Sequence, residues 1–112
     1  MTVLTARVTA RPSERRELAQ ALLTWAAAAR REAGAVMSNV YEDVEAPAVF
    51  GLVAEWKSRE DLEAHLRSEG FSVLMGALEL LGDPSRLAIT RMDDDSADDT
   101  LRTIRKQRET KS

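Results

Sequence analysis

The chain has 112 residues, of which 44% are hydrophobic and 31% are charged, and its formal net charge is −3. These values indicate one ordinary globular domain, with no general attraction to nucleic acid or to an acidic membrane surface. The absence of cysteine excludes disulfides, a catalytic thiolate and a zinc–thiolate site. We see no signal peptide and no membrane span, so we expect a cytoplasmic protein.

The first third of the chain predicts a strand and then a helix. Residues 3–10 alternate between apolar and polar side chains, as in a strand with one buried face. We expect Ser13 to cap the following helix and Gly34 to end it as the C′ residue. The helix carries one apolar stripe at helical spacing, formed by Leu18, Leu22, Trp25 and Ala29.

Two further strands are predicted at residues 35–44 and 48–56. The second of these is apolar on both of its faces. One face holds Val49, Gly51 and Val53, and the other holds Phe50, Leu52, Ala54 and Trp56. A strand in a sheet with one wet face should alternate apolar and polar residues, so we expect both sides of this strand to be covered.

The last part of the domain predicts a broken helix and a final strand. Ser58 and Asp61 form a variant of the capping box, which marks a helix start. Gly70 is expected to interrupt the helix, and Gly82 to end its second half. Residues 86–92 predict the last strand. The second half carries an apolar stripe of Phe71, Leu74, Leu78 and Leu81.

A charged tail at residues 93–112 follows a domain at residues 1–92. Its aspartates precede its arginines and lysines, which suits the dipole of a short helix, and Leu101 and Ile104 could dock such a helix. Two interpretations remain open, a solvated tail or a helix that reaches onto a partner subunit.

The predicted order of elements, βαββαβ, is that of the ferredoxin-like plait. We therefore expect an α+β protomer with a four-stranded antiparallel sheet and both helices on one face. The third strand would leave apolar side chains exposed on the other face, and such a surface usually marks an interaction site. The simplest cover is a second copy packed sheet on sheet, which predicts a homodimer through the open face.

Two segments together resemble the antibiotic biosynthesis monooxygenase (ABM) domain. They are EAGAVMSNVYEDVEAP at residues 32–47 and VFGLVAEWKSREDLEAHLRSEGF at residues 49–71. The resemblance extends over about residues 2–92. It implies that two ferredoxin-like protomers form a dimeric α/β barrel. It also implies that catalytic members oxygenate quinol-like or polycyclic aromatic substrates without metal or flavin, so no cofactor is expected.

Cofactor-free oxygenation needs an apolar cavity that binds an aromatic ring and favours its deprotonated form. His65 is the only histidine, and histidine exchanges protons readily near neutral pH, so it is the candidate base. Tyr41 and Asn39 are the other candidate catalytic groups. The candidate substrate-binding residues are Trp56, Phe50, Leu52, Phe71, Leu74 and Leu78.

Each candidate also has a purely structural interpretation. His65, between Leu62 and Leu66, could be a satisfied core histidine, and Trp56 could be core packing with its N–H bonded. Haem-degrading enzymes of the same superfamily are a separate possibility. By resemblance, they use an axial histidine on the second helical segment, an asparagine on the first strand and a tryptophan. Residues 71–81 hold no histidine and residues 3–10 no asparagine, which disfavours haem degradation.

Three functions therefore remain open for the sequence. The first is a cofactor-independent monooxygenase that acts on a small aromatic or quinol-type molecule. The second is a non-catalytic dimeric module for small-ligand binding or stress response with the same fold. The third is isomerisation or degradation of a small signalling metabolite. The low aromatic content, 4%, favours a small ligand over a large polycyclic one.

Overall fold

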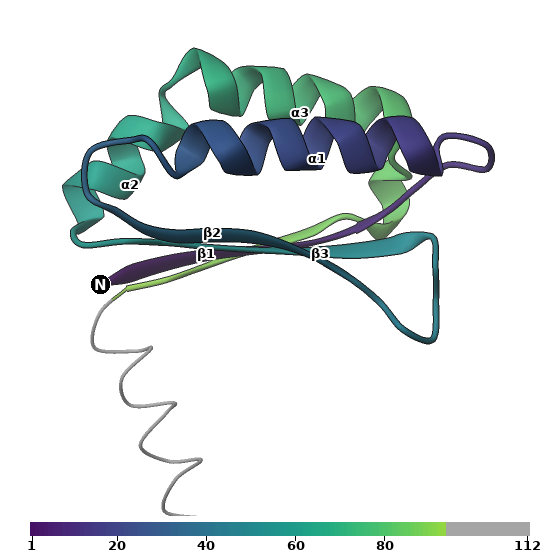
Figure 1. Ribbon diagram of the computed structural model, residues 1–112, viewed down its shortest axis with the longest axis horizontal. Coiled ribbons are helices and arrows are strands. Elements are labelled where there is room, and N and C mark those ends of the chain that lie inside the picture. Colours follow the sequence, from purple (N-terminus) through teal and green to yellow (C-terminus); the bar gives the residue numbers. More distant parts are fainter. Residues whose placement is uncertain (94–112) are drawn as a thin grey trace, which may run out of the picture.

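The computed structural model describes residues 1–93, which form one sheet covered on one face by helices (Figure 1). Within these residues, no helix is long and apolar enough to span a membrane. The predicted tail, apart from Asp93, lies outside the described residues. The elements in chain order are β1 (Thr2–Thr9), α1 (Arg15–Ala29), β2 (Ala35–Glu42), β3 (Val49–Trp56), α2 (Arg59–Leu66), α3 (Glu69–Leu81), a 3-10 helix (Pro84–Arg86) and β4 (Ala88–Met92).

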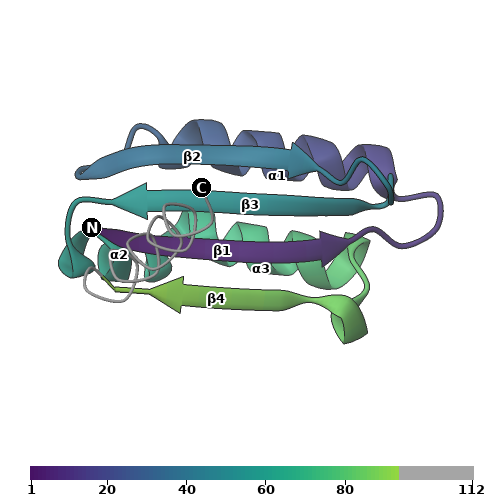
Figure 2. The same cartoon turned by 90° about the horizontal axis from the view of Figure 1, so that it is seen from below.

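The four strands form an antiparallel sheet in the order β2-β3-β1-β4 (Figure 2). This order is that of the ferredoxin-like plait, so the predicted fold class is confirmed. The helix α1 connects β1 to β2, and α2 with α3 connects β3 to β4. All three helices cover the same face of the sheet, and no described element covers the other (Figure 1).

The core lies between this sheet and its helices, and β3 supplies the centre of it. The side chains of β3 that face the helices are buried, whereas those that alternate with them on the open face are half-buried. The predicted assignment of these residues to two faces of the strand is confirmed. The predicted stripe of α1 is also buried against the sheet. Each fully buried Leu in such a layer contributes about 1.5–3 kcal/mol of stability. The buried members of β3 are Phe50, Leu52, Ala54 and Trp56, and those of the stripe are Leu18, Leu22, Trp25 and Ala29.

The start of α1 differs from the sequence prediction. Ser13 does not cap the helix, because α1 begins at Arg15 and Glu14 occupies the N-cap position without a side-chain hydrogen bond. Ser13 instead has a φ of 71°, in a turn where the Glu14 N–H donates to the carbonyl of Arg11 at 3.0 Å. This left-handed backbone reverses the chain over the sheet before the helix begins.

The helical region after β3 breaks at Ser68 and not at Gly70. Ser58 caps α2 as predicted, since its Oγ accepts a hydrogen bond from the Asp61 N–H at 3.1 Å. Ser68 caps α3 in the same way, accepting from the Phe71 N–H at 3.2 Å. Gly70 therefore lies inside the first turn of α3, and a second N-cap serine was the signal for the break.

The two outer strands are shorter than predicted. β2 ends at Glu42, and its pairing with β3 is irregular between Ala35 and Met37, which leaves Val36 48% exposed. Arg86 belongs to the 3-10 helix, so β4 begins only at Ala88. Both corrections concern strand ends, where propensity and periodicity are weakest as signals.

Gly34 lies in the turn before β2 and does not end α1, which stops at Ala29 with Arg30 as its C-cap. Its φ is 78°, and a Cβ added there would come within 2.0 Å of Oδ2 of Asp61. The turn between α1 and β2 therefore packs directly against the first turn of α2. This turn also contains Glu32, so Gly34 helps to fix the position of that carboxylate.

We expect Gly34→Ala to lower the free energy of unfolding by about 2 kcal/mol or more, because the left-handed backbone alone costs an alanine roughly 1–2 kcal/mol. Urea unfolding would measure the change. Gly76→Ala is the matched control, since an added Cβ at this α3 position would meet nothing within 4 Å. It should stabilise by about 0.5–1 kcal/mol. Equal destabilisation by both substitutions would contradict the proposed constraint at Gly34.

Candidate functional site

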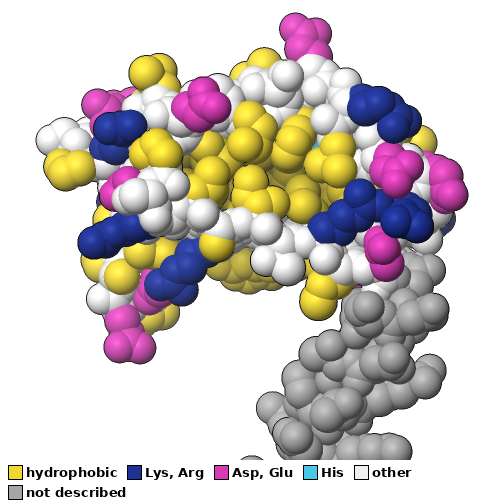
Figure 3. Space-filling model, turned by 180° about the vertical axis from the view of Figure 1, so that it is seen from behind, with side chains coloured by type: hydrophobic (Ala, Val, Ile, Leu, Met, Phe, Trp, Pro, Cys, Tyr) yellow, Lys and Arg dark blue, Asp and Glu magenta, His cyan; other side chains and the backbone are white. Residues whose placement is uncertain are grey.

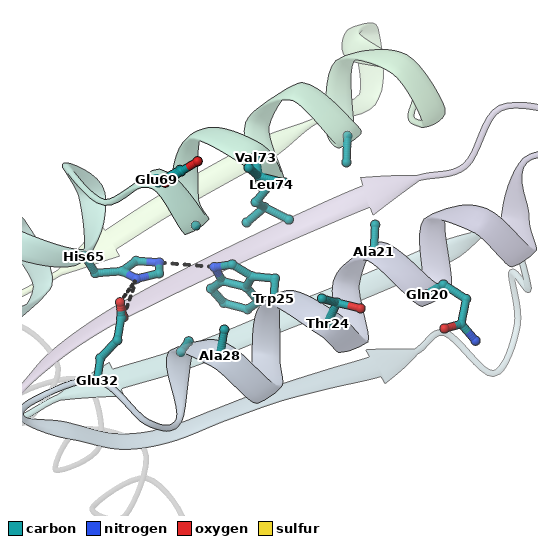
Figure 4. A pocket seen from close by; sticks show the side chains of 13 residues that line it. Gln20, Ala21, Thr24, Trp25, Ala28, Glu32, His65, Glu69, Val73 and Leu74 are labelled. Atoms are coloured by element: carbon teal, nitrogen blue, oxygen red, sulfur yellow. Dashed lines mark hydrogen bonds and ion pairs between the residues drawn. The ribbon is translucent and has the colours of Figure 1, made fainter.

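A cavity of about 500 Å³ lies between α1 and α3 on the helical side of the molecule (Figure 4). This volume falls in the range of small-molecule sites. Trp25 and Leu74 form part of its buried floor. Hydrophobic side chains gather on the outer face over this region, with charged side chains around them (Figure 3). The walls include Gln20, Thr24 and Ala28 of α1 and Gly70, Val73 and Ala77 of α3.

His65 lies at one end of this cavity, in the last turn of α2, and is only 3% exposed. The ring of Trp56 is tilted against it with centroids 4.7 Å apart. The ring of Phe71 approaches it edge-on at 5.4 Å. These apolar contacts fix the plane of the imidazole and direct its two nitrogens towards hydrogen-bond partners.

Both nitrogens of His65 have a partner from the α1 side (Figure 4). The Nε1–H of Trp25 donates to Nε2 at 3.1 Å. The carboxylate of Glu32 lies 2.5 Å and 2.9 Å from Nδ1. An indole N–H can only donate, so Nε2 must be the unprotonated nitrogen and Nδ1–H must donate to Glu32. The hydrogen bonds therefore assign one tautomer, with the lone pair on Nε2.

The local fold explains how these three residues meet. Trp25 belongs to the apolar stripe of α1 and is held at the floor of the cavity. Glu32 follows the end of α1, in the turn that Gly34 holds against α2. The Ser58 cap fixes the start of α2, whose last turn carries His65.

The sequence prediction missed the roles of Trp25 and Glu32. Trp25 was assigned only to the stripe, although a buried tryptophan needs a partner for its N–H. Glu32 lies just beyond the C-terminal end of α1, where the helix dipole disfavours a carboxylate. That conflict was the available signal that Glu32 has a positively polarised partner elsewhere.

Only one of the predicted substrate-binding residues, Leu74, lines the cavity together with His65. Three others surround a gap of only about 10 Å³ beneath it. A gap of this size barely admits one water molecule, so they act as core packing in this structure. These three residues are Leu52, Phe71 and Leu78.

The remaining two predicted substrate-binding residues are buried in the core. The guanidinium of Arg15 lies 5.2 Å from the ring centre of Phe50. Trp56 lies beneath His65 and is 1% exposed. Its Nε1 has no hydrogen-bond partner among residues 1–93, so the prediction that this N–H would be bonded was wrong. Trp56 can therefore support the imidazole only through its ring.

Asn39 and Tyr41 lie on the opposite face of the sheet from His65. They pair with Val53 and Gly51, which belong to the open face of β3. The Nδ2 of Asn39 donates to Oη of Tyr41 at 3.3 Å, and Tyr41 is 51% exposed. Within one protomer, the structure does not bring these two residues together with His65, and a catalytic role for them stays a prediction.

The described residues 1–93 contain no cluster of three or more potential metal-ligating side chains. One carboxyl away from the cavity has a shifted pKa. The hydroxyl and N–H of Ser85 donate to Asp83, which lowers the pKa of the Asp83 carboxyl. This depressed pKa stabilises the fold above the ordinary pKa of an aspartate, and the contribution is lost as the pH falls through the lowered value.

Comparisons with known proteins agree with this architecture. No curated protein matches the chain. A candidate antibiotic biosynthesis monooxygenase from Deinococcus radiodurans is 26% identical with a TM-score of 0.76, over 84% of this chain and 92% of that one. A Pseudomonas aeruginosa protein is 25% identical with a TM-score of 0.73, over 83% and 92%. A Mycobacterium tuberculosis protein, 22% identical with a TM-score of 0.75 over 83% and 93%, shares the fold.

The family assignment comes from the sequence match itself. Residues 1–76, which include β1 to β3, all of α2 and the first part of α3, match the family model described as antibiotic biosynthesis monooxygenase. This match covers more than half of the chain and contains Trp25, Glu32 and His65. The chain therefore belongs to the antibiotic biosynthesis monooxygenase family.

Proposed function

We propose that this protein is a cofactor-independent monooxygenase that acts on a small aromatic or quinol-type substrate. The observation that carries the proposal is the unprotonated Nε2 of His65 at the end of an apolar cavity of about 500 Å³. Glu32 lies directly behind the imidazole, 2.5 Å from Nδ1. A base that is supported by a carboxylate and opens into an apolar cavity can deprotonate an aromatic hydroxyl.

In the proposed reaction, a quinol hydroxyl transfers its proton to Nε2 of His65, and the Glu32 carboxylate stabilises the resulting imidazolium. The quinolate then donates one electron to O₂. The resulting superoxide and substrate radical combine at a ring carbon to form a peroxide anion. The imidazolium of His65 returns its proton to this peroxide, which then loses water and leaves His65 as the free base. Quinol and O₂ are thereby converted to hydroxyquinone and water, so that one oxygen atom enters the product. The apolar walls keep bulk water away from these intermediates.

Oxygen consumption by the purified protein tests this function. We expect a panel of benzohydroquinone, naphthohydroquinone and anthrone to include a substrate that consumes one O₂ per molecule. The variant Leu80→Arg, at an exposed position of α3 that does not line the cavity, is the control and should keep most of the uptake. Binding to the cavity without uptake by any compound would contradict catalysis and favour the non-catalytic ligand-binding module.

We also propose that two copies pair through the open face of the sheet. That face carries a patch of apolar side chains which no described element covers, and a second copy would bury it sheet on sheet. Its half-buried members are Val3, Met37, Val49 and Val53, next to the exposed Tyr41.

Val53→Arg should raise the dissociation constant of this dimer at least tenfold. Each of the two copies would bring one unpaired arginine charge into the same interface. Light scattering across a dilution series would measure the dissociation constant. Leu80→Arg is the matched control on α3, at a site that is 73% exposed on the helical side. It should leave association unchanged. A wild-type protein that is monomeric at micromolar concentration would rule out the open-face dimer.

A further inference from the structure

We propose that Trp25 is a catalytic hydrogen-bond donor that stabilises the substrate oxyanion. The hydroxyl of the substrate approaches this pair from the cavity, replaces the hydrogen bond between Trp25 and His65, donates its proton to Nε2, and then accepts a hydrogen bond from the indole N–H. The inference rests on the proposed function insofar as it requires a substrate with an acidic aromatic hydroxyl.

The candidate base already has a hydrogen-bond partner at Nε2. The lone pair of Nε2 already accepts the Trp25 N–H at 3.1 Å, in a buried hydrogen bond. His65 can therefore take a proton only from a group that displaces this N–H. The substrate hydroxyl must therefore reach this hydrogen bond from the cavity side and replace it. An oxygen beside the line that joins the two nitrogens, about 3 Å from each, lies within hydrogen-bond distance of both once the two rings tilt towards the cavity.

The indole of Trp25 stays at the cavity when the substrate arrives. Trp25 is 6% exposed, and a gap of only about 10 Å³ adjoins it among packed core side chains. Its ring therefore has little room to sink away from the cavity. A buried N–H that loses its acceptor is unfavourable, and the incoming oxygen is the acceptor that replaces Nε2.

The charges of the site stay balanced after the proposed proton transfer. The proton leaves the substrate oxygen for Nε2, so the imidazolium lies against Glu32 and the phenolate oxygen against the Trp25 N–H. The net charge of the site does not change, and each new charge faces a group of complementary polarity. A fixed donor aimed at a developing oxyanion in a site shielded from water is an effective form of catalysis.

This arrangement defines the chemical class of the substrate. The inserted group must both donate a proton and accept a hydrogen bond, and it must be attached to a flat apolar body that fits between α1 and α3. Phenols and enols satisfy these requirements. An aryl methyl ether of the same shape can accept from Trp25 but cannot donate to His65, so it should bind more weakly and should not react.

Absorption spectroscopy with para-nitrophenol tests the role of Trp25 without oxygen chemistry, because the phenol and the phenolate absorb at different wavelengths. We expect the wild-type protein to bind the probe with an increased phenolate fraction. Trp25→Phe should lower the phenolate-to-phenol ratio of the bound probe about tenfold. Leu23→Ala is the control on the same helix, since Leu23 is 53% exposed and does not line the cavity, and it should preserve the ratio.

An equal or higher ratio in Trp25→Phe would overturn the proposal, because Trp25 would then only occupy the lone pair of Nε2. If Trp25→Phe does not fold, the indole N–H resonance of Trp25 in the unaltered protein decides. It should shift when the probe binds, and an unmoved resonance would overturn the proposal. A normal phenolate signal without oxygen uptake by any quinol would refute the proposed monooxygenase alone and leave the donor role of Trp25 supported.

Discussion

Replacement of His65 by glutamine should lower kcat/KM for the quinol substrate by about 100- to 10,000-fold, the range that a positioned general base supplies. Glutamine is chosen because its amide offers an acceptor for the Trp25 N–H and a donor for Glu32. It can therefore preserve both hydrogen bonds of the imidazole, but it cannot take up a proton. The loss of activity should appear in steady-state oxygen uptake.

The stability of the His65→Gln variant is the control for this result. Because both partners remain bonded, we expect its thermal unfolding midpoint to stay close to that of the wild type. A folded variant that keeps more than half of the wild-type kcat/KM would show that His65 is a core residue and not the base. That outcome would restore the structural interpretation of the histidine.

Glu32→Gln should lower kcat/KM about 100-fold, with most of the effect in kcat. The amide oxygen can still accept from Nδ1–H, so the tautomer and the ring position are retained. The negative charge that stabilises the imidazolium is lost, and it matters only once the proton has been transferred. A loss confined to KM would contradict this assignment.

Glu69→Gln provides the matched control for Glu32→Gln. Glu69 is an exposed carboxylate that lines the same cavity from the first turn of α3. Unlike Glu32, Glu69 forms no ion pair or hydrogen bond with His65 in the described part of the chain. We therefore expect Glu69→Gln to retain kcat/KM within a factor of about three. Equal losses in the two variants would indicate a general effect of cavity charge and would remove the specific role of Glu32.

The fold could be predicted from the sequence because its main signals are local and mutually consistent. The alternation within β3, the apolar stripe of α1 and the Ser58 cap each define one element, and their order selects the ferredoxin-like plait. Two of the errors occurred at Ser13 and Gly34, where turns and not helix ends require an unusual backbone. Such turns depend on how the chain packs over the sheet, which no local pattern specifies.

The candidate site could be predicted only in part. The sequence identified His65, but its partners Trp25 and Glu32 lie 40 and 33 residues away along the chain. A period of two shows that Asn39 and Tyr41 share one face of β2, but it does not show which face meets the helices. The pairing of β2 with β3 places that face on the open side of the sheet. The separation of the two polar groups from His65 is therefore a property of strand register.

The most direct test of the central claim is one turnover of the preferred quinol under isotopically labelled oxygen gas, followed by mass spectrometry of the product. The proposed chemistry predicts a hydroxyquinone that carries one labelled oxygen atom with the wild-type protein, and formation of that product at least about 100-fold more slowly with His65→Gln. A quinone without label would identify a simple oxidase. A labelled product formed equally well by His65→Gln would contradict base catalysis by His65 in the cavity between α1 and α3.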